Sequence, residues 1–142
     1  MSSTGLAAFE HTVDITNGWL KELDERLGWG ADSHRAYHAL RAVLHALRDR
    51  LPPEGTADLG AQLPMLVRGF YYEGWRPAGK PVKERTKERF LSHIAAAFAG
   101  DAYTDPEVVA RAVFKLLKAR VSDGEIQDVK HNLPHELLYL WE

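Results

Sequence analysis

The residues best suited to chemistry are basic side chains that recur along one predicted helix. They occur at spacings of four, three, four and three residues, and they are His34, His38, Arg41, His45 and Arg48. Because a helix turns by about 100° per residue, they share one face, within an arc of roughly 80°. Guanidinium and imidazole groups can bind carboxylates and phosphates, so this face is a candidate anion-binding surface. The alternative is a solvated outer face of the helix.

A second basic face follows further along the chain, at a numbering offset of 111 − 41 = 70. Three positions carry basic residues again, in the pairs Arg41 and Arg111, His45 and Lys115, and Arg48 and Lys118. Two such faces at repeated positions could form a symmetric cradle for an anion or an acidic partner. We therefore take these six residues as candidate binding residues.

The histidines raise the question of a metal ion. His34 and His38 are one helical turn apart, and two histidines at that spacing can hold zinc. A zinc site needs further ligands, and the sequence has neither a cysteine nor an HExxH motif. Thr104 and Val108 replace the two histidines at the repeated positions. We therefore predict no metal site and no cofactor.

An arginine and an aspartate also recur together. Arg50 precedes Asp58 by the same interval as Arg120 precedes Asp128. We predict that each arginine forms an ion pair with the aspartate that follows it and joins two neighbouring helices. The sequence has no Walker loop, G-x-S-x-G elbow or dinucleotide-binding glycine pattern, and no local constellation of acid and base, so we predict no enzymatic activity.

The elements that must position these residues are helices, and they occur in two copies. The segment RAVLHALRDRL, which begins at Arg41, aligns with RAVFKLLKARV, which begins at Arg111, with five identities. Further upstream the offset becomes 71, so that Trp19 matches Phe90. We predict an all-α fold of two tandem, pseudo-symmetric repeats of about four helices each, packed into one compact bundle. Repeat one is 8–73, the linker is 74–81 and repeat two is 82–142.

Local signals support helices in both copies. Apolar residues at spacings of three and four predict buried faces, and we expect Leu47 and its counterpart Leu117 to lie in the core. The segment Ser122–Glu125 is typical of a capping box at a helix start. Pro64 and Pro134 are each expected to open a short last helix.

Four aromatic rings gather in LPMLVRGFYYEGW, which ends at Trp75. We expect the closing helix of repeat one to pack into its core through four residues, which are Leu66, Val67, Phe70 and Tyr71. The tail from Tyr72 to Trp75 has no counterpart in repeat two. We predict that it turns the chain and clasps the two repeats, and we add Tyr72 and Trp75 to the candidate binding residues.

The segment after Glu73 is rich in charge. Six basic residues face three acidic ones between Glu73 and Arg89. Cations can bind phosphate and Trp75 can stack on a base, so this is where nucleic acid would bind. The whole chain has a net charge of −2, which gives no bulk attraction to nucleic acid, and we therefore rank nucleic acid below protein as a partner.

Three segments together resemble the bacterial family designated domain of unknown function 2267. They are RAVLHALRDRLPPEGTADLGAQLP, FYYEGWRPAGKPVK and GEIQDVKHNLPHELLYLW. The resemblance extends from about Phe9 to Trp141 and implies an all-helical protein. It implies no activity, substrate or catalytic residue.

Composition narrows the class of protein. The chain has 142 residues, 45% of them hydrophobic, without cysteine or a run of about 18 apolar residues. Its first residues have no basic start and reach an acid at Glu10, so we expect no signal peptide. We expect a cytoplasmic protein without a membrane partner that acts through contacts with itself or with another protein. The alternative is a regulatory module that binds an anion, a nucleotide or nucleic acid through the basic helix faces and the linker.

Overall fold

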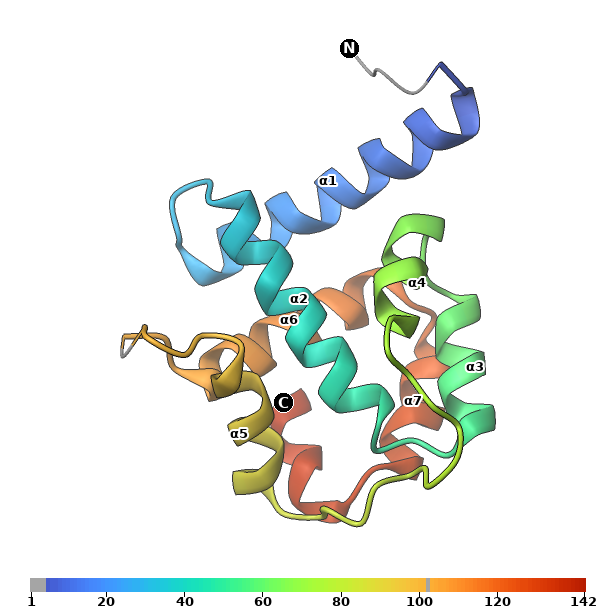
Figure 1. Cartoon of the computed structure of the whole chain (residues 1–142), viewed down its shortest axis with the longest axis vertical. Coiled ribbons are helices and arrows are strands. Elements are labelled where there is room, and N and C mark those ends of the chain that lie inside the picture. The colour runs from blue at the N-terminus through green and yellow to red at the C-terminus, as the bar shows by residue number, and fades with distance from the viewer. Residues whose placement is uncertain (1–4, 102) are drawn as a thin grey trace.

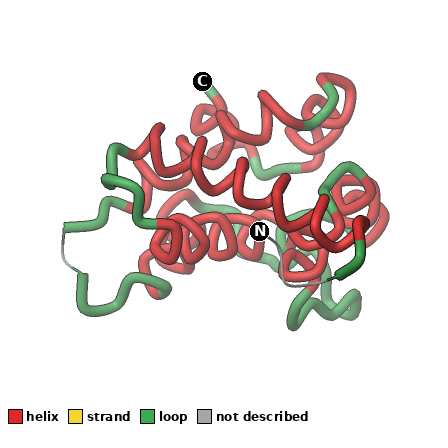
Figure 2. The backbone as a smooth tube through the Cα atoms, turned by 90° about the horizontal axis from the view of Figure 1, so that it is seen from above, coloured by secondary structure: helices red, strands yellow, loops and turns green. Residues whose placement is uncertain are grey.

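The structure of the protein is a computed structural model, which describes residues 5–101 and 103–142. These residues form eight helices and no strand (Figure 1). In chain order the helices are α1 (Ala7–Leu27), α2 (Ser33–Arg48), α3 (Pro53–Ala61), α4 (Met65–Tyr72), α5 (Lys87–Ala96), α6 (Pro106–Arg120), α7 (Asp123–Asn132) and the 3₁₀ helix η1 (His135–Trp141). The fold is therefore all-α, as predicted, and Figure 2 shows the helices joined by loops into one compact body. No helix among the described residues is long and apolar enough to cross a membrane.

The helices begin where the local signals predict. Ser122 precedes α7, and its hydroxyl accepts a hydrogen bond from the backbone N–H of Glu125 in the first turn, where N–H groups have no partner within the helix. Pro64 and Pro134 stand immediately before α4 and η1. The starts of α3 and α7 differ by the offset of the aligned segments (123 − 53 = 70), and so do those of α4 and η1 (135 − 65 = 70).

The core forms around α2 and α6, which pack against each other and cross near the middle of the molecule (Figure 1). Leu47 of α2 and Leu117 of α6 are both 0% exposed, which confirms the predicted buried faces. The first helix of each half contacts both central helices. Helix α1 packs on α2 and α6, and α5 likewise packs on α6 and α2. The short helices complete the body, with α4 on α2, η1 on α6 and α3 against α7.

The structure corrects the predicted ion pairs of Arg50 with Asp58 and of Arg120 with Asp128. Each arginine instead pairs with a carboxylate in the other half of the chain, Arg50 with Glu84 and Arg120 with Glu22, at N–O distances of 3.1 and 2.7 Å. The prediction was wrong because it assumed partners close in sequence, whereas the fold brings distant segments nearer to both guanidinium groups.

Both aspartates instead lie on the exposed side of the contact between α3 and α7. Their charges act on a third carboxyl group, that of Glu125. Burial raises the pKa of Glu125, and the negative charges of Asp58 and Asp128 raise it further. This contact therefore gathers like charges rather than ion pairs.

Candidate functional site

The basic face of α2 is largely occupied by contacts within the protein. Arg48 is only 4% exposed. Its Nη1 donates to the main-chain carbonyls of Tyr71 and Glu73, the latter at 2.8 Å. Because the last carbonyls of a helix have no partner inside it, Arg48 caps the end of α4. The guanidinium group of Arg48 therefore stabilises the fold and is not exposed for a ligand.

His45 lies one turn before Arg48 and is tied to the same helix end. Its Nε2 is 2.6 Å from the carbonyl oxygen of Phe70, so Nε2 carries a proton and donates it. Burial lowers the pKa of His45, and the charges of Arg48 and Arg41 lower it further. The imidazole is therefore neutral at pH 7. Arg41, nearer the surface, pairs with Glu73 at 2.9 Å.

The basic face of α6 repeats one of these contacts and leaves one cation uncompensated. Nζ of Lys118 donates to the carbonyl of Trp141 at 2.9 Å, and both positions are the counterparts, at the same offset, of Arg48 and Tyr71. Arg111 pairs with Glu107 at 3.2 Å. Lys115 is exposed and has no hydrogen-bond or ion-pair partner among the described residues.

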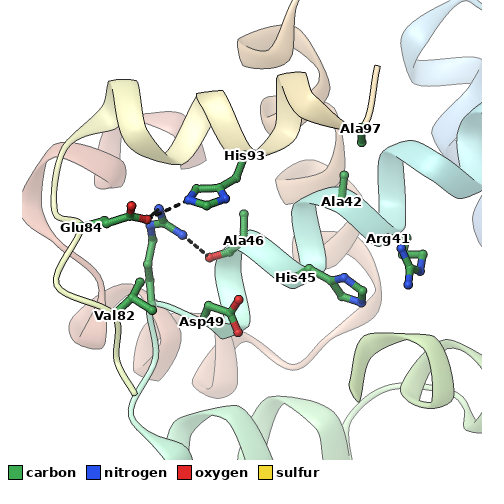
Figure 3. A pocket seen from close by; sticks show the side chains of 10 residues that line it. Arg41, Ala42, His45, Ala46, Asp49, Val82, Glu84, His93 and Ala97 are labelled. Atoms are coloured by element: carbon green, nitrogen blue, oxygen red, sulfur yellow. Dashed lines mark hydrogen bonds and ion pairs between the residues drawn. The ribbon is translucent and has the colours of Figure 1, made fainter. Parts of the chain in front are cut away.

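Two clefts receive the remaining basic groups. The α2–α5 cleft is a cavity of about 230 Å³ between α2, α5 and the segment that joins the linker to α5 (Figure 3), and its lining includes Arg41, His45, Arg50, Glu84 and His93. The α1–α6 cleft is a cavity of about 290 Å³, lined by Arg26, Val108, Arg111, Ala112 and Lys115. In the alignment of the two halves, Arg111 corresponds to Arg41, and Lys115 to His45. Of the three basic positions that recur in both segments, the structure thus places the first two in a cleft and the third, Arg48 or Lys118, against a helix end.

The α2–α5 cleft has balanced charge. Glu84 accepts hydrogen bonds from Arg50 at 3.1 Å and from His93 at 2.8 Å. Figure 3 shows the side chain of His93 directed at Glu84. The hydrogen bond from His93, followed by the charges of His93, Arg50 and Arg89, holds the pKa of Glu84 below its usual range. A second carboxylate, that of Asp49, also lines the cavity. The two carboxylates offset the two arginines of the lining.

The α1–α6 cleft, in contrast, has only basic residues among its ionisable lining. Arg26 pairs with Glu22 at 3.0 Å, but Glu22 also pairs with Arg120. Arg26 lies in the first half of the chain and comes from the last turn of α1. Sequence reasoning missed it because nothing in the repeat pattern indicates that α1 lies along α6.

Tyr72 and Trp75 pack against the first half of the chain. Their ring centroids are 5.7 Å apart, and the tyrosine hydroxyl end lies against Gly60 of α3, where an added Cβ would come within 2.4 Å of the oxygen. Both side chains are half-buried. The residue that follows the linker is fixed to the end of α2, where the N–H of Val82 donates to the carbonyl of Asp49 at 2.8 Å.

Exposed apolar side chains gather where α1 meets α4. Phe9 is 45% exposed, Met65 54% and Leu66 43%, so Leu66 does not pack into the core as expected, whereas its three predicted companions are buried. Beside them a groove of about 390 Å³ runs between α1, α2 and α4, with Leu20 and Phe70 in its lining. We call these three exposed side chains and the groove the α1–α4 apolar surface. The span of α4 is too short for periodicity to show which of its apolar residues face outward.

His34 and His38 face each other across one turn of α2, as their spacing predicts, with 3.1 Å between their Nε2 atoms. Within residues 5–101 and 103–142, no group of three or more histidine, cysteine, aspartate or glutamate side chains is arranged to hold a metal ion.

Comparison with known proteins gives a match over most of the chain. The family model described as "Uncharacterized conserved protein (DUF2267)" matches residues 16–140. No curated protein matches the chain.

Proposed function

The chain belongs to the DUF2267 family of uncharacterized conserved proteins, and from its surface we propose that it is a non-enzymatic helical protein that associates with a second copy of itself. The α1–α4 apolar surface is the observation that carries this proposal. Folded monomers rarely leave large apolar side chains grouped on one face unless that face meets a partner. Removing such area from water contributes about 25 cal/mol per Å².

A second copy is the partner that this surface fits best. In a two-fold dimer the same patch serves both subunits, so it must offer both a projecting group and a place to receive one. Phe9 and Met65 are exposed, and Leu66, the chain neighbour of Met65, lines the groove. Phe9 lies seven residues before Thr16, and Thr16 lies four residues before Leu20, so the three share one face of α1. Thr16 and Leu20 both line the groove. The net charge of −2 gives little repulsion between copies.

The proposal includes the two-repeat architecture, with repeat one at 8–73, the linker at 74–81 and repeat two at 82–142. Support comes from the helix starts that share one offset and from the matching caps of Arg48 and Lys118. The α1–α4 apolar surface belongs to repeat one alone, because α1 has 21 residues and α5 only 10. One such surface per chain predicts a dimer rather than a filament.

Sedimentation equilibrium and light scattering over a concentration series test the proposal. We expect a monomer–dimer equilibrium in the wild type and a monomer in the variants Phe9→Asp and Met65→Asp. Tyr103→Asp is the matched control, because Tyr103 is 97% exposed in the loop between α5 and α6. A wild type that stays monomeric at every concentration, or a dimer that Tyr103→Asp disrupts equally, would refute self-association through this surface.

A further inference from the structure

We infer that the α1–α6 cleft binds a small phosphate-type anion. This inference goes beyond self-association, because the cleft involves other residues than the α1–α4 apolar surface. It rests on the composition of the lining, on its charge and on the fact that two helices contribute to it.

The charge around the cleft is strongly positive. Three cations and no carboxylate line it, namely Arg26, Arg111 and Lys115. Arg26 pairs with Glu22 and Arg111 with Glu107, and each of these two carboxylates also contacts a cation outside the lining. Each carboxylate already contacts two cations, so neither can neutralise Lys115. The lining therefore keeps a positive charge at Lys115 beside two guanidinium groups that share their carboxylates with other cations, and this favours an anion.

The donors come from two directions. Arg26 belongs to the last turn of α1, while Arg111 and Lys115 stand one turn apart on α6. Groups from two helices can contact one anion from two sides. The oxygens of a phosphate can accept from a guanidinium in a bidentate manner and from an ammonium as a point charge. Ala112, a small residue, leaves room between the donors, and the cavity of about 290 Å³ is large enough for a phosphate group with some water.

The α2–α5 cleft provides a comparison, because it has carboxylates in its lining where the α1–α6 cleft has none. It occupies the corresponding place beside α2, but Asp49 and Glu84 line it, and His45 stands where the α1–α6 cleft has Lys115. Its carboxylates would repel a phosphate, so the two clefts should differ sharply in anion binding. The chain therefore contains its own control site.

Titration with inorganic phosphate, followed by calorimetry and by NMR shifts at constant ionic strength with chloride as the replaced ion, tests the inference. We expect saturable binding that perturbs residues of the α1–α6 cleft. Lys115→Gln should weaken it about tenfold, the loss of one charge-assisted hydrogen bond. This side chain forms no hydrogen bond or ion pair with the other described residues, so its replacement should leave the fold unchanged.

Arg41→Gln, in the α2–α5 cleft, removes the same single charge and should leave phosphate binding unchanged. Equal weakening by Arg41→Gln would mean that phosphate responds to overall charge, and would overturn the inference. Absence of saturable binding to the wild type, or unchanged binding in Lys115→Gln, would overturn it as well. Sedimentation of Lys115→Gln should match that of the wild type, which separates this site from self-association.

Discussion

Lys118 caps the C-terminal end of η1 by donating a hydrogen bond to the carbonyl of Trp141, and Arg48 does the same for Tyr71 at the end of α4. The two contacts use different cations at equivalent positions of the two aligned segments. Both hold a short helix against a long one. A basic residue that looks from sequence like a ligand-binding group can therefore be needed for the fold.

These caps predict unequal losses of stability. Arg48→Met should lower the free energy of unfolding by about 1–3 kcal/mol, because it removes the donor from the buried carbonyl of Tyr71 and from the partly buried carbonyl of Glu73. Lys118→Met should lower it by less, about 0.5–1.5 kcal/mol, because water can replace the exposed ammonium. Urea denaturation measures both. A larger loss for Lys118→Met would contradict this account.

Core substitutions test the predicted helix faces. Leu47→Ala and Leu117→Ala should each lower the free energy of unfolding by about 2–5 kcal/mol, since both side chains are fully buried and their removal leaves a cavity. Val108→Ala, on an exposed side chain of α6, is the control and should change it by less than about 0.5 kcal/mol. Thermal and urea unfolding should agree. Wild-type stability in either leucine variant would show that its face is wrongly assigned.

Two helical glycines should respond to alanine in opposite directions. Gly69→Ala should stabilise the protein by about 0.5–1 kcal/mol, because nothing lies within 4 Å of the new Cβ and alanine favours the helix. Gly60→Ala should destabilise it, because the new Cβ would collide with the ring end of Tyr72. Unfolding of Gly60→Ala in a Tyr72→Ala background provides the check. If the collision is the cause, the penalty disappears there.

The pair of Arg50 and Glu84 predicts a dependence of stability on pH. The pKa of Glu84 is lower in the folded protein than in the unfolded chain, so its contribution is complete above the unfolded value of about 4.3 and is lost as the pH falls through the folded value. Glu84→Gln should therefore cost about 1–3 kcal/mol at pH 7, because Arg50, 2% exposed, loses its counter-charge.

That difference between Glu84→Gln and the wild type should shrink as the pH falls below about 4.3. Urea denaturation at a series of pH values measures it. Glu25→Gln is the matched control, since Glu25 is exposed and forms no ion pair with another described residue. A constant difference across the acid range would argue against an ionised Glu84 as the partner.

The sequence was sufficient for what depends on neighbouring residues. Spacing along the chain predicted the buried faces of Leu47 and Leu117, and local signals at Ser122 and Pro134 located helix starts. These features follow from backbone geometry and from hydrogen bonds between nearby groups, which the order of residues determines directly.

Features that depend on how the two halves meet could not be derived in this way. Arg50 reaches Glu84 because the linker returns past the end of α2, and Arg26 joins Arg111 and Lys115 because α1 lies along α6. The upstream alignment does pair Arg26 with Ala97, a residue of the α2–α5 cleft (97 − 26 = 71), but each cleft comes from tertiary packing. The sequence thus shows which basic residues are present, but it does not show which of them meet in one cleft.

The packing of each half's first helix on the other half, α1 on α6 and α5 on α2, has a consequence for how the protein is made. While the ribosome is still translating the linker, α5 does not yet exist and α1 has no α6 to pack on. The nascent chain must keep apolar residues such as Leu44 away from other chains until almost the whole protein has emerged. Stable folding should therefore come late in synthesis, and the first half alone should be a client of chaperones rather than an independent folding unit.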